Sequence, residues 1–413
     1  MRRSRLCVAA AVLVFGTPGT RARGQIWTQQ AKLLAETPGE YVFFGEPVAV
    51  HASTLMVGEN VGPVRVFSYD GSGWHQTQIL DPGYPGPISI DMDGEAAIFG
   101  RMMTFYGEAR IVEQTAGAWQ FATTFSAPST SYVFYGADAG LSGSTAIVGA
   151  PQGPGACSFS GVALVYEKVG GAWSGPVLLA AEDGARDDEF GCSVDVSGSA
   201  AIVGANAHHG NGEDSGAAYV FEKSAGGWQQ VAKLLPADVI AESRFGNSVA
   251  ISGSRAIVGA PRNNPAGSHS GSAYVFERTA DGWEQTARLV PHDAGSFDYV
   301  GECVAICGSR AVVSAWGDDD TAPNSGAAYI FEDTGSGWEE VAKLVAVDGD
   351  EDDRFGSSVA LSDALVVAGA HWDDQQGYRS GSAYVFIPEP ATLGLLGAAV
   401  AMLLRRRRRS RRR

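Results

Sequence analysis

Residues 245–283 read FGNSVAISGSRAIVGAPRNNPAGSHSGSAYVFERTADGW and form the clearest copy of a unit that recurs along the chain. Two runs rich in small and β-branched residues, 248–251 and 256–260, flank a Ser-Gly-Ser tripeptide. Glycine accepts the positive φ that a tight hairpin turn requires. A third run, 271–277, alternates aromatic with other residues, and a fourth begins at Trp283 after a second turn. Four antiparallel strands in about 50 residues match the size of a propeller blade.

Two markers count the repeats independently. The residue that opens the first strand recurs at Phe44, Tyr84, Tyr135, Phe190, Phe245, Val300 and Phe355. The tryptophan that opens the fourth strand recurs at Trp27, Trp74, Trp119, Trp173, Trp228, Trp283 and Trp338. Trp316 and Trp372 fall outside this pattern, in loops. Both markers predict seven blades.

The two series are out of phase at the ends of the repeat region. A fourth-strand sequence begins at Trp27 with no first three strands before it, and the last repeat, residues 355–386, stops before a fourth strand. We expect the N-terminal strand to complete the last blade, because an open stack leaves sheet faces and edges unsatisfied. The predicted fold is all-β: a seven-bladed β-propeller of four-stranded antiparallel blades over residues 25–387, closed by the N-terminal strand.

The first 24 residues have the features of a secretory signal peptide. Arg2, Arg3 and Arg5 precede an apolar run, residues 6–15, and a region of small residues. The run is too short to span a bilayer. Residues 1–24 therefore predict export, and the alternative, a buried N-terminal helix, has no place among the repeats.

The C-terminal tail, residues 388–413, has three parts: Pro388-Glu389-Pro390, an apolar run, and an arginine cluster. In this order they resemble the PEP-CTERM sorting signal of Gram-negative and related bacteria. The resemblance implies that an exosortase-type membrane protease cleaves near this tripeptide, with residues 391–404 as a transient membrane anchor. It also implies that the mature protein reaches the cell surface or the extracellular matrix. Basic residues after an apolar segment stay in the cytoplasm, which favours the same orientation. The alternatives are a plain C-terminal anchor and a basic tail that binds nucleic acid.

Removing both tails changes the charge balance. They hold 13 of the 30 basic residues, so 17 remain against 45 acidic ones, a net charge of about −28. A surface this acidic argues against nucleic acid and anionic membranes as partners.

The repeat contains Phe245-Gly246 at its start and Gly259-Ala260-Pro261 after its second strand, and in this it resembles the FG-GAP repeat. This family forms the seven-bladed propeller at the head of integrin α chains and occurs in bacterial surface proteins. In the integrin pattern, a calcium loop rich in Asp lies between the first and second strands. Here that connection is as short and neutral as Ser252-Gly253-Ser254, whereas calcium takes six to eight oxygen ligands. Calcium sites are therefore not carried over from the family, and only residues 91–94, Asp-Met-Asp-Gly, keep part of the pattern.

The carboxylates are concentrated in longer loops, which join the fourth strand to the next first strand and the second strand to the third. In an antiparallel blade both kinds of loop emerge on one face, which we call the long-loop face; the tight turns lie on the opposite, short-loop face. Long loops on a rigid scaffold commonly carry function. The density of oxygen ligands makes calcium the possible cofactor, with a solvated acidic loop as the alternative. The expected ligands are Asp348, Asp350 and Asp352, or Asp183 and Asp187.

No residue pattern of a known catalytic or nucleotide-binding motif occurs, and the cysteines have neither zinc nor paired spacing. Propeller enzymes assemble sites from scattered loop residues, so a glycan-active lyase or hydrolase with paired carboxylates remains an alternative. The periodic Trp and Tyr-x-Phe positions are assigned to the core between blades and not to sugar stacking. We expect a non-enzymatic propeller that binds an extracellular protein or glycan in adhesion. A structural matrix role is the second hypothesis.

Overall fold

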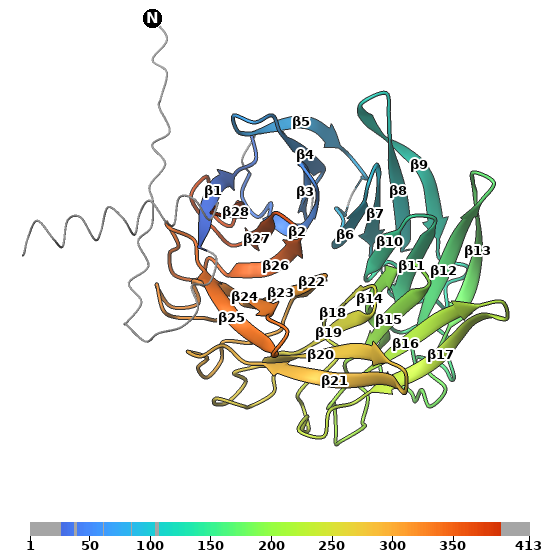
Figure 1. Cartoon of the computed structure of the whole chain (residues 1–413). Coiled ribbons are helices and arrows are strands. Elements are labelled where there is room, and N and C mark those ends of the chain that lie inside the picture. The colour runs from blue at the N-terminus through green and yellow to red at the C-terminus, as the bar shows by residue number, and fades with distance from the viewer. Residues whose placement is uncertain (1–25, 37–38, 61, 84, 104–106, 390–413) are drawn as a thin grey trace, which may run out of the picture.

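The computed structural model describes residues 26–36, 39–60, 62–83, 85–103 and 107–389. Seven antiparallel sheets of four strands surround a common axis, as Figure 1 shows. This arrangement confirms the predicted all-β, seven-bladed propeller. The expected signal peptide and the tail beyond Glu389, including Pro390 and residues 391–404, lie outside the described residues. No helix in the described ranges is long and apolar enough to cross a membrane.

Blades 1 to 6 each run from their innermost to their outermost strand in chain order, and blade 7 takes its outermost strand from the start of the chain. Blade 1 contains β2 (Phe44–His51), β3 (Thr54–Glu59), β4 (Val64–Tyr69) and β5 (Trp74–Leu80). Blade 2 contains β6 (Ser89–Asp93), β7 (Ala96–Arg101), β8 (Glu108–Thr115) and β9 (Ala118–Ser126). Blade 3 contains β10 (Ala139–Ser142), β11 (Thr145–Ala150), β12 (Val162–Val169) and β13 (Ala172–Leu179). Blade 4 contains β14 (Phe190–Ser197), β15 (Ala200–Ala205), β16 (Ala217–Ser224) and β17 (Gly227–Leu234).

The remaining blades follow the same order. Blade 5 contains β18 (Val249–Ser252), β19 (Arg255–Ala260), β20 (Ser272–Thr279) and β21 (Gly282–Leu289). Blade 6 contains β22 (Val304–Cys307), β23 (Arg310–Ala315), β24 (Ala327–Asp333) and β25 (Trp338–Leu344). Blade 7 contains β26 (Phe355–Leu361), β27 (Val366–Ala370), β28 (Ser382–Pro388) and, as its outermost strand, β1 (Trp27–Leu33). In blade 2 the marker Tyr84 lies outside the described residues.

The seventh blade closes the ring, as the offset between the two markers predicts. Strand β1 pairs antiparallel with β28, from Trp27 opposite Pro388 to Leu33 opposite Ala383. The backbone N–H of Glu389 donates to the carbonyl of Ile26 over 2.6 Å. Because β28 ends and β1 begins at the same level of the sheet, both chain ends leave the ring on the short-loop face.

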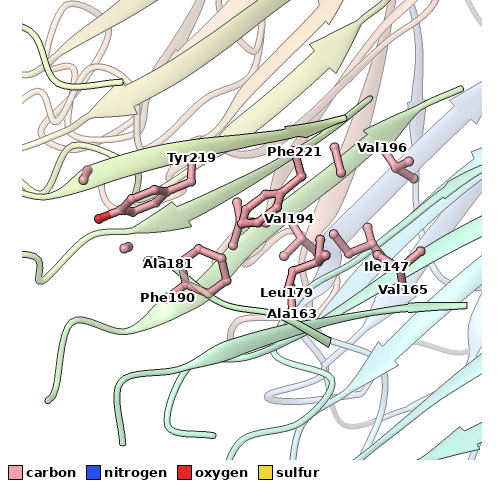
Figure 2. Close-up of a cluster of buried hydrophobic side chains, with 14 residues drawn as sticks. Ile147, Ala163, Val165, Leu179, Ala181, Phe190, Val194, Val196, Tyr219 and Phe221 are labelled. Atoms are coloured by element: carbon pink, nitrogen blue, oxygen red, sulfur yellow. The ribbon is translucent and has the colours of Figure 1, made fainter. Parts of the chain in front are cut away.

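The hydrophobic core lies between blades. Figure 2 shows one such cluster, in which Tyr219, Phe221 and Phe190 of blade 4 face Leu179 and Val165 of blade 3. Tyr219 is fully buried and Phe221 is 3% exposed. The periodic aromatic residues therefore fill the space between sheets, as expected, because a single four-stranded blade cannot bury its own faces.

The innermost strands are also joined by side chains that cap backbone groups of the next blade. Asp195 in β14 accepts the N–H of Ile251 in β18 over 2.7 Å, and Ser193 accepts the N–H of Val249 over 3.1 Å. In blade 2, Asp91 accepts the N–H of Leu141 over 2.7 Å. This carboxylate, part of the remnant of the family's calcium pattern, thus bonds to the neighbouring blade.

Candidate functional site

A repeated ion-pair cluster holds the loops of the long-loop face. In blade 7, Lys32 of β1 donates to Asp348 over 2.8 Å and to Asp373 over 2.6 Å. The hydroxyl of Tyr384 donates to the same two carboxylates, and the Asp373 side chain is only 3% exposed. Burial would raise the pKa of Asp348, but Lys32 and Tyr384 outweigh it and hold that pKa below its usual value.

Blade 4 repeats this cluster with one substitution. Lys233 and the hydroxyl of Tyr219 both donate to Asp183, over 2.5 and 2.9 Å. His208 stands in the place of Asp373 and contacts Lys233 at 2.7 Å. The carboxylates of Asp183 and Asp348 thus each bind a lysine from the outermost strand and a tyrosine from the third strand.

The remaining predicted ligands point to different partners. Asp350 is exposed and donates its backbone N–H to Asp353 over 2.8 Å. Asp352 accepts from the side chain of Asn324 over 2.9 Å, and Asp187 lies 3.4 Å from Arg186. Within the described ranges, no group of three or more His, Cys, Asp or Glu side chains is arranged to hold a metal ion. Calcium at these five aspartates stays a prediction.

A cavity of about 410 Å³ runs along the propeller axis, lined by the innermost strands. Carboxyl groups face it from several blades, including Glu46, Asp138 and Glu302. Burial is the main cause that raises the pKa of Asp138 to about 6 and of Glu46 to about 7. Glu46 and Glu302 lie near the end of the channel that opens on the long-loop face, because each follows closely on a loop that leads into an innermost strand.

At this mouth, aromatic and arginine side chains of blades 6 and 7 form one continuous stack. Tyr299, which leads into the first strand of blade 6, stacks on Trp316 with ring centroids 4.8 Å apart and planes 4° apart. The guanidinium carbon of Arg354 lies 4.5 Å from the centre of the Trp316 ring and 3.3 Å from that of Trp372. The guanidinium of Arg379 lies 3.7 Å from the same Trp372 ring. Two guanidinium groups this close to one ring centre would overlap on a single face, so they occupy opposite faces of Trp372.

The stack ends in exposed aromatic side chains. Arg379 lies 5.1 Å from the ring of Tyr378, which meets Tyr41 of blade 1 edge to face at 5.1 Å. Tyr41 is 51% exposed and Tyr378 is 46% exposed. Solvent therefore reaches two aromatic rings directly beside an arginine.

The arginines of the stack have no carboxylate partner. In the described part of the chain, neither Arg354 nor Arg379 forms an ion pair, and the buried Nε of Arg354 has no hydrogen-bond partner. Burial and the like charge of Arg379 lower the pKa of Arg354. An unpaired, partly buried cation on so acidic a protein is costly, which makes this place the candidate site.

Beside the stack, His371 of blade 7 faces Glu46 of blade 1. The His371 Nε2 atom lies 3.5 Å from a Glu46 carboxyl oxygen, and its buried Nδ1 has no hydrogen-bond partner. Burial, with the charges of Arg354 and Arg379, lowers the pKa of His371 to about 3. The imidazole is therefore neutral near pH 7.

The residues at the mouth differ from those predicted as the site. The sequence did contain an indication of this site, because Trp316 and Trp372 are the two tryptophans that do not fit the repeat. His371 lies in the loop between the second and third strands of blade 7. Its burial against Glu46 depends on closure of the ring between blades 7 and 1.

Comparison with known proteins identifies the repeats. Residues 173–221, 228–276, 283–331 and 338–386 each match the FG-GAP repeat, and residues 386–409 match the PEP-CTERM protein-sorting motif. Each matched repeat begins at the tryptophan of an outermost strand and ends with the third strand of the next blade. The chain as a whole begins and ends at the same points of the repeat, which is why β1 completes blade 7. No curated protein matches the chain. Among solved structures, the computationally designed Ika8 protein has a TM-score of 0.50 at 12% identity, over 88% of this chain and 100% of that one. That likeness concerns the fold alone.

The protein is thus a seven-bladed β-propeller that contains four FG-GAP repeats. It carries a PEP-CTERM sorting motif, which indicates export and association with the bacterial cell surface and implies processing by exosortase-type machinery.

Proposed function

We propose that this exported propeller is a binding protein in adhesion, and that its ligand, an extracellular glycan or protein, docks on the long-loop face at the channel mouth of blades 6, 7 and 1. The observation that carries the proposal is the stack from Tyr299 through Trp316, Arg354 and Trp372 to Arg379. It combines exposed aromatic surface with unpaired hydrogen-bond donors, as binding sites do.

The way in which the scaffold presents these side chains supports the proposal. The residue before the first-strand marker has a left-handed backbone in six blades: Phe43, Phe134, Glu189, Arg244, Tyr299 and Arg354, with φ between 54° and 60°. Such a backbone costs about 1 kcal/mol or more at a residue other than glycine. The backbone is repeated while the side chain varies in charge and shape, which favours a surface that selects a ligand over one that only holds the ring.

A binding screen with the purified full chain tests this function. Glycan-array and cell-aggregation assays should show binding that Trp372→Ala abolishes. Trp228→Ala, on the outermost strand of blade 4, should leave the choice of ligand unchanged. Binding that survives Trp372→Ala unchanged would place the ligand elsewhere. No binding in either assay would leave the structural matrix role.

A glycan-active enzyme is the second candidate, and Glu46 is the observation that favours it. A carboxyl group with a pKa of about 7 can donate a proton near neutral pH, and Glu302 supplies a second carboxyl group in the same channel. Release of shortened glycan, absent in Glu46→Gln, would establish this activity in place of binding alone.

A further inference from the structure

We propose that the channel-mouth site recognises an acidic polysaccharide and binds its carboxylate groups through Arg354 and Arg379. This inference rests on the proposed binding function and names the class of its ligand.

The charge distribution supports an anionic ligand. The chain without its tails has a net charge of about −28, and most arginines and lysines in the described ranges are paired with carboxylates. On the same face, Arg288 donates to Asp238 over 2.6 Å and Lys32 to Asp348 over 2.8 Å. Arg354 and Arg379 are instead held on the two faces of Trp372, and within the described ranges neither guanidinium forms an ion pair. Stacking fixes each guanidinium plane while its edge stays available for a carboxylate.

The spacing suits a ligand with repeated charges. Because the two guanidinium carbons lie 3.3 and 3.7 Å from one ring centre, they can be no more than about 7 Å apart. Two like charges at that distance repel each other in the free protein. A polymer with one carboxylate on each successive sugar can neutralise both without a large change in its conformation.

The aromatic rim favours a glycan over an acidic peptide. Tyr378 and Tyr41 expose their rings next to Arg379, and a flat, partly apolar ring is the surface on which the C–H face of a sugar packs. An acidic peptide segment offers carboxylates but no comparable face beside each one. Glu46 and Asp352 are the nearby acids that act on the charge of Arg354, and they restrict where a second carboxylate can sit.

Titration calorimetry with two matched probes tests the inference. One probe is oligogalacturonate with free carboxylates, and the other is the same oligosaccharide as its methyl ester. We expect the full chain to bind the acid at least about tenfold more tightly than the ester, and the difference to shrink as salt is added. Arg379→Gln should weaken acid binding by about tenfold or more. Tyr378→Ala, a second variant at the rim, should weaken the binding of both probes.

Arg186→Gln is the matched control. Arg186 also lies over an aromatic ring on the long-loop face, 5.3 Å from Phe159, but it is paired with Asp187. Its loss should leave acid binding unchanged. The inference is overturned if the acid does not bind, if the ester binds equally well, or if Arg379→Gln behaves like Arg186→Gln. If a neutral glycan or a protein binds and Arg379→Gln does not change that binding, the acidic ligand is ruled out while the proposed binding function stays in place.

Discussion

Gly259 of blade 5 packs directly against the carbonyl group of Gly301, which leads into blade 6. A Cβ atom on Gly259 would lie 3.0 Å from the carbonyl carbon of Gly301 and nearer still to its oxygen. Gly301 in turn has φ +91°, and its Cβ would lie 2.5 Å from the carbonyl oxygen of Ser272. The Phe-Gly and Gly-Ala steps that define the repeat are thus the two sides of one backbone contact between neighbouring blades.

Gly259→Ala should therefore destabilise the propeller through the joint between blades. We expect a loss of about 2 to 4 kcal/mol in the free energy of unfolding, because one blade must move for the added methyl group to fit. Gly253→Ala is the control: Gly253 has φ +60° with open space around it, and its substitution should cost about 1 kcal/mol. Urea unfolding measures both. Equal losses would mean that the joint contributes nothing beyond backbone conformation.

Ring closure depends on Lys32. Lys32→Met removes the cation that Asp348 and the buried Asp373 share, and we expect it to cost about 2 to 4 kcal/mol because Asp373 stays buried without that partner. Lys343→Met is the comparison within one continuous blade: Lys343 contacts the buried Asp318 at 2.7 Å, so its loss should cost a similar amount without involving a chain end. Deletion of residues 25–36 should lower the melting temperature far more than either substitution. A deletion variant that melts like the full chain would contradict closure by β1.

The stability of the protein should depend on Glu46 between about pH 5 and pH 8. The pKa of Glu46 is raised in the folded state to about 7, so the folded protein binds this proton more tightly than the unfolded chain does. The contribution of Glu46 to the free energy of unfolding is complete below the unfolded pKa of about 4.5 and is lost as the pH rises through 7. After allowance for the partial exposure of the side chain, this amounts to about 1 to 2 kcal/mol.

Glu46→Gln should remove that part of the pH dependence. Neutral His371 acts in the opposite direction, because its lowered pKa destabilises the fold as the pH falls below about 6.5. The informative quantity is hence the difference between wild type and variant at each pH. A difference that does not change from pH 5 to pH 8 would refute the raised pKa of Glu46.

Calcium at Asp348, as proposed from the sequence, would compete with Lys32 for the same carboxylate. We therefore expect Lys32→Met to bind calcium about tenfold more tightly than the wild type does, measured by isothermal titration. Lys343→Met serves as the control, because its cluster belongs to blade 6. The absence of calcium heat at millimolar ion in all three proteins would remove the proposal.

The repeat pattern predicts the ring well because each marker residue has a role set by its position within one repeat. Trp27 starts an outermost strand, and Gly259 makes a contact that Gly149, Gly204 and Gly369 repeat in other blades, so both can be identified by counting along the chain. The loops are different, because their contacts join residues that no short pattern connects. Asp348 was expected to hold calcium since its neighbours are acidic, whereas its actual partner, Lys32, lies 316 positions away.

The same reason explains why the channel mouth was missed. Trp316 and Trp372 are visible as departures from the repeat, but nothing local indicates that Arg354 lies between them. That arrangement depends on the left-handed backbone at Arg354, whose N–H donates to the carbonyl of Asn324 in the preceding blade over 3.1 Å. Only the assembled ring brings these loops together.

The pairing of Trp27 with Pro388 has a consequence for how the molecule is displayed. A tether attached through the sorting motif would pull at the short-loop side, and the stack around Trp372 would then face away from it. The tripeptide that begins at Pro388 starts inside the last strand, opposite Trp27 at the start of β1. A cut after it would remove no hydrogen-bonded strand, so the propeller would leave its tether as an intact ring.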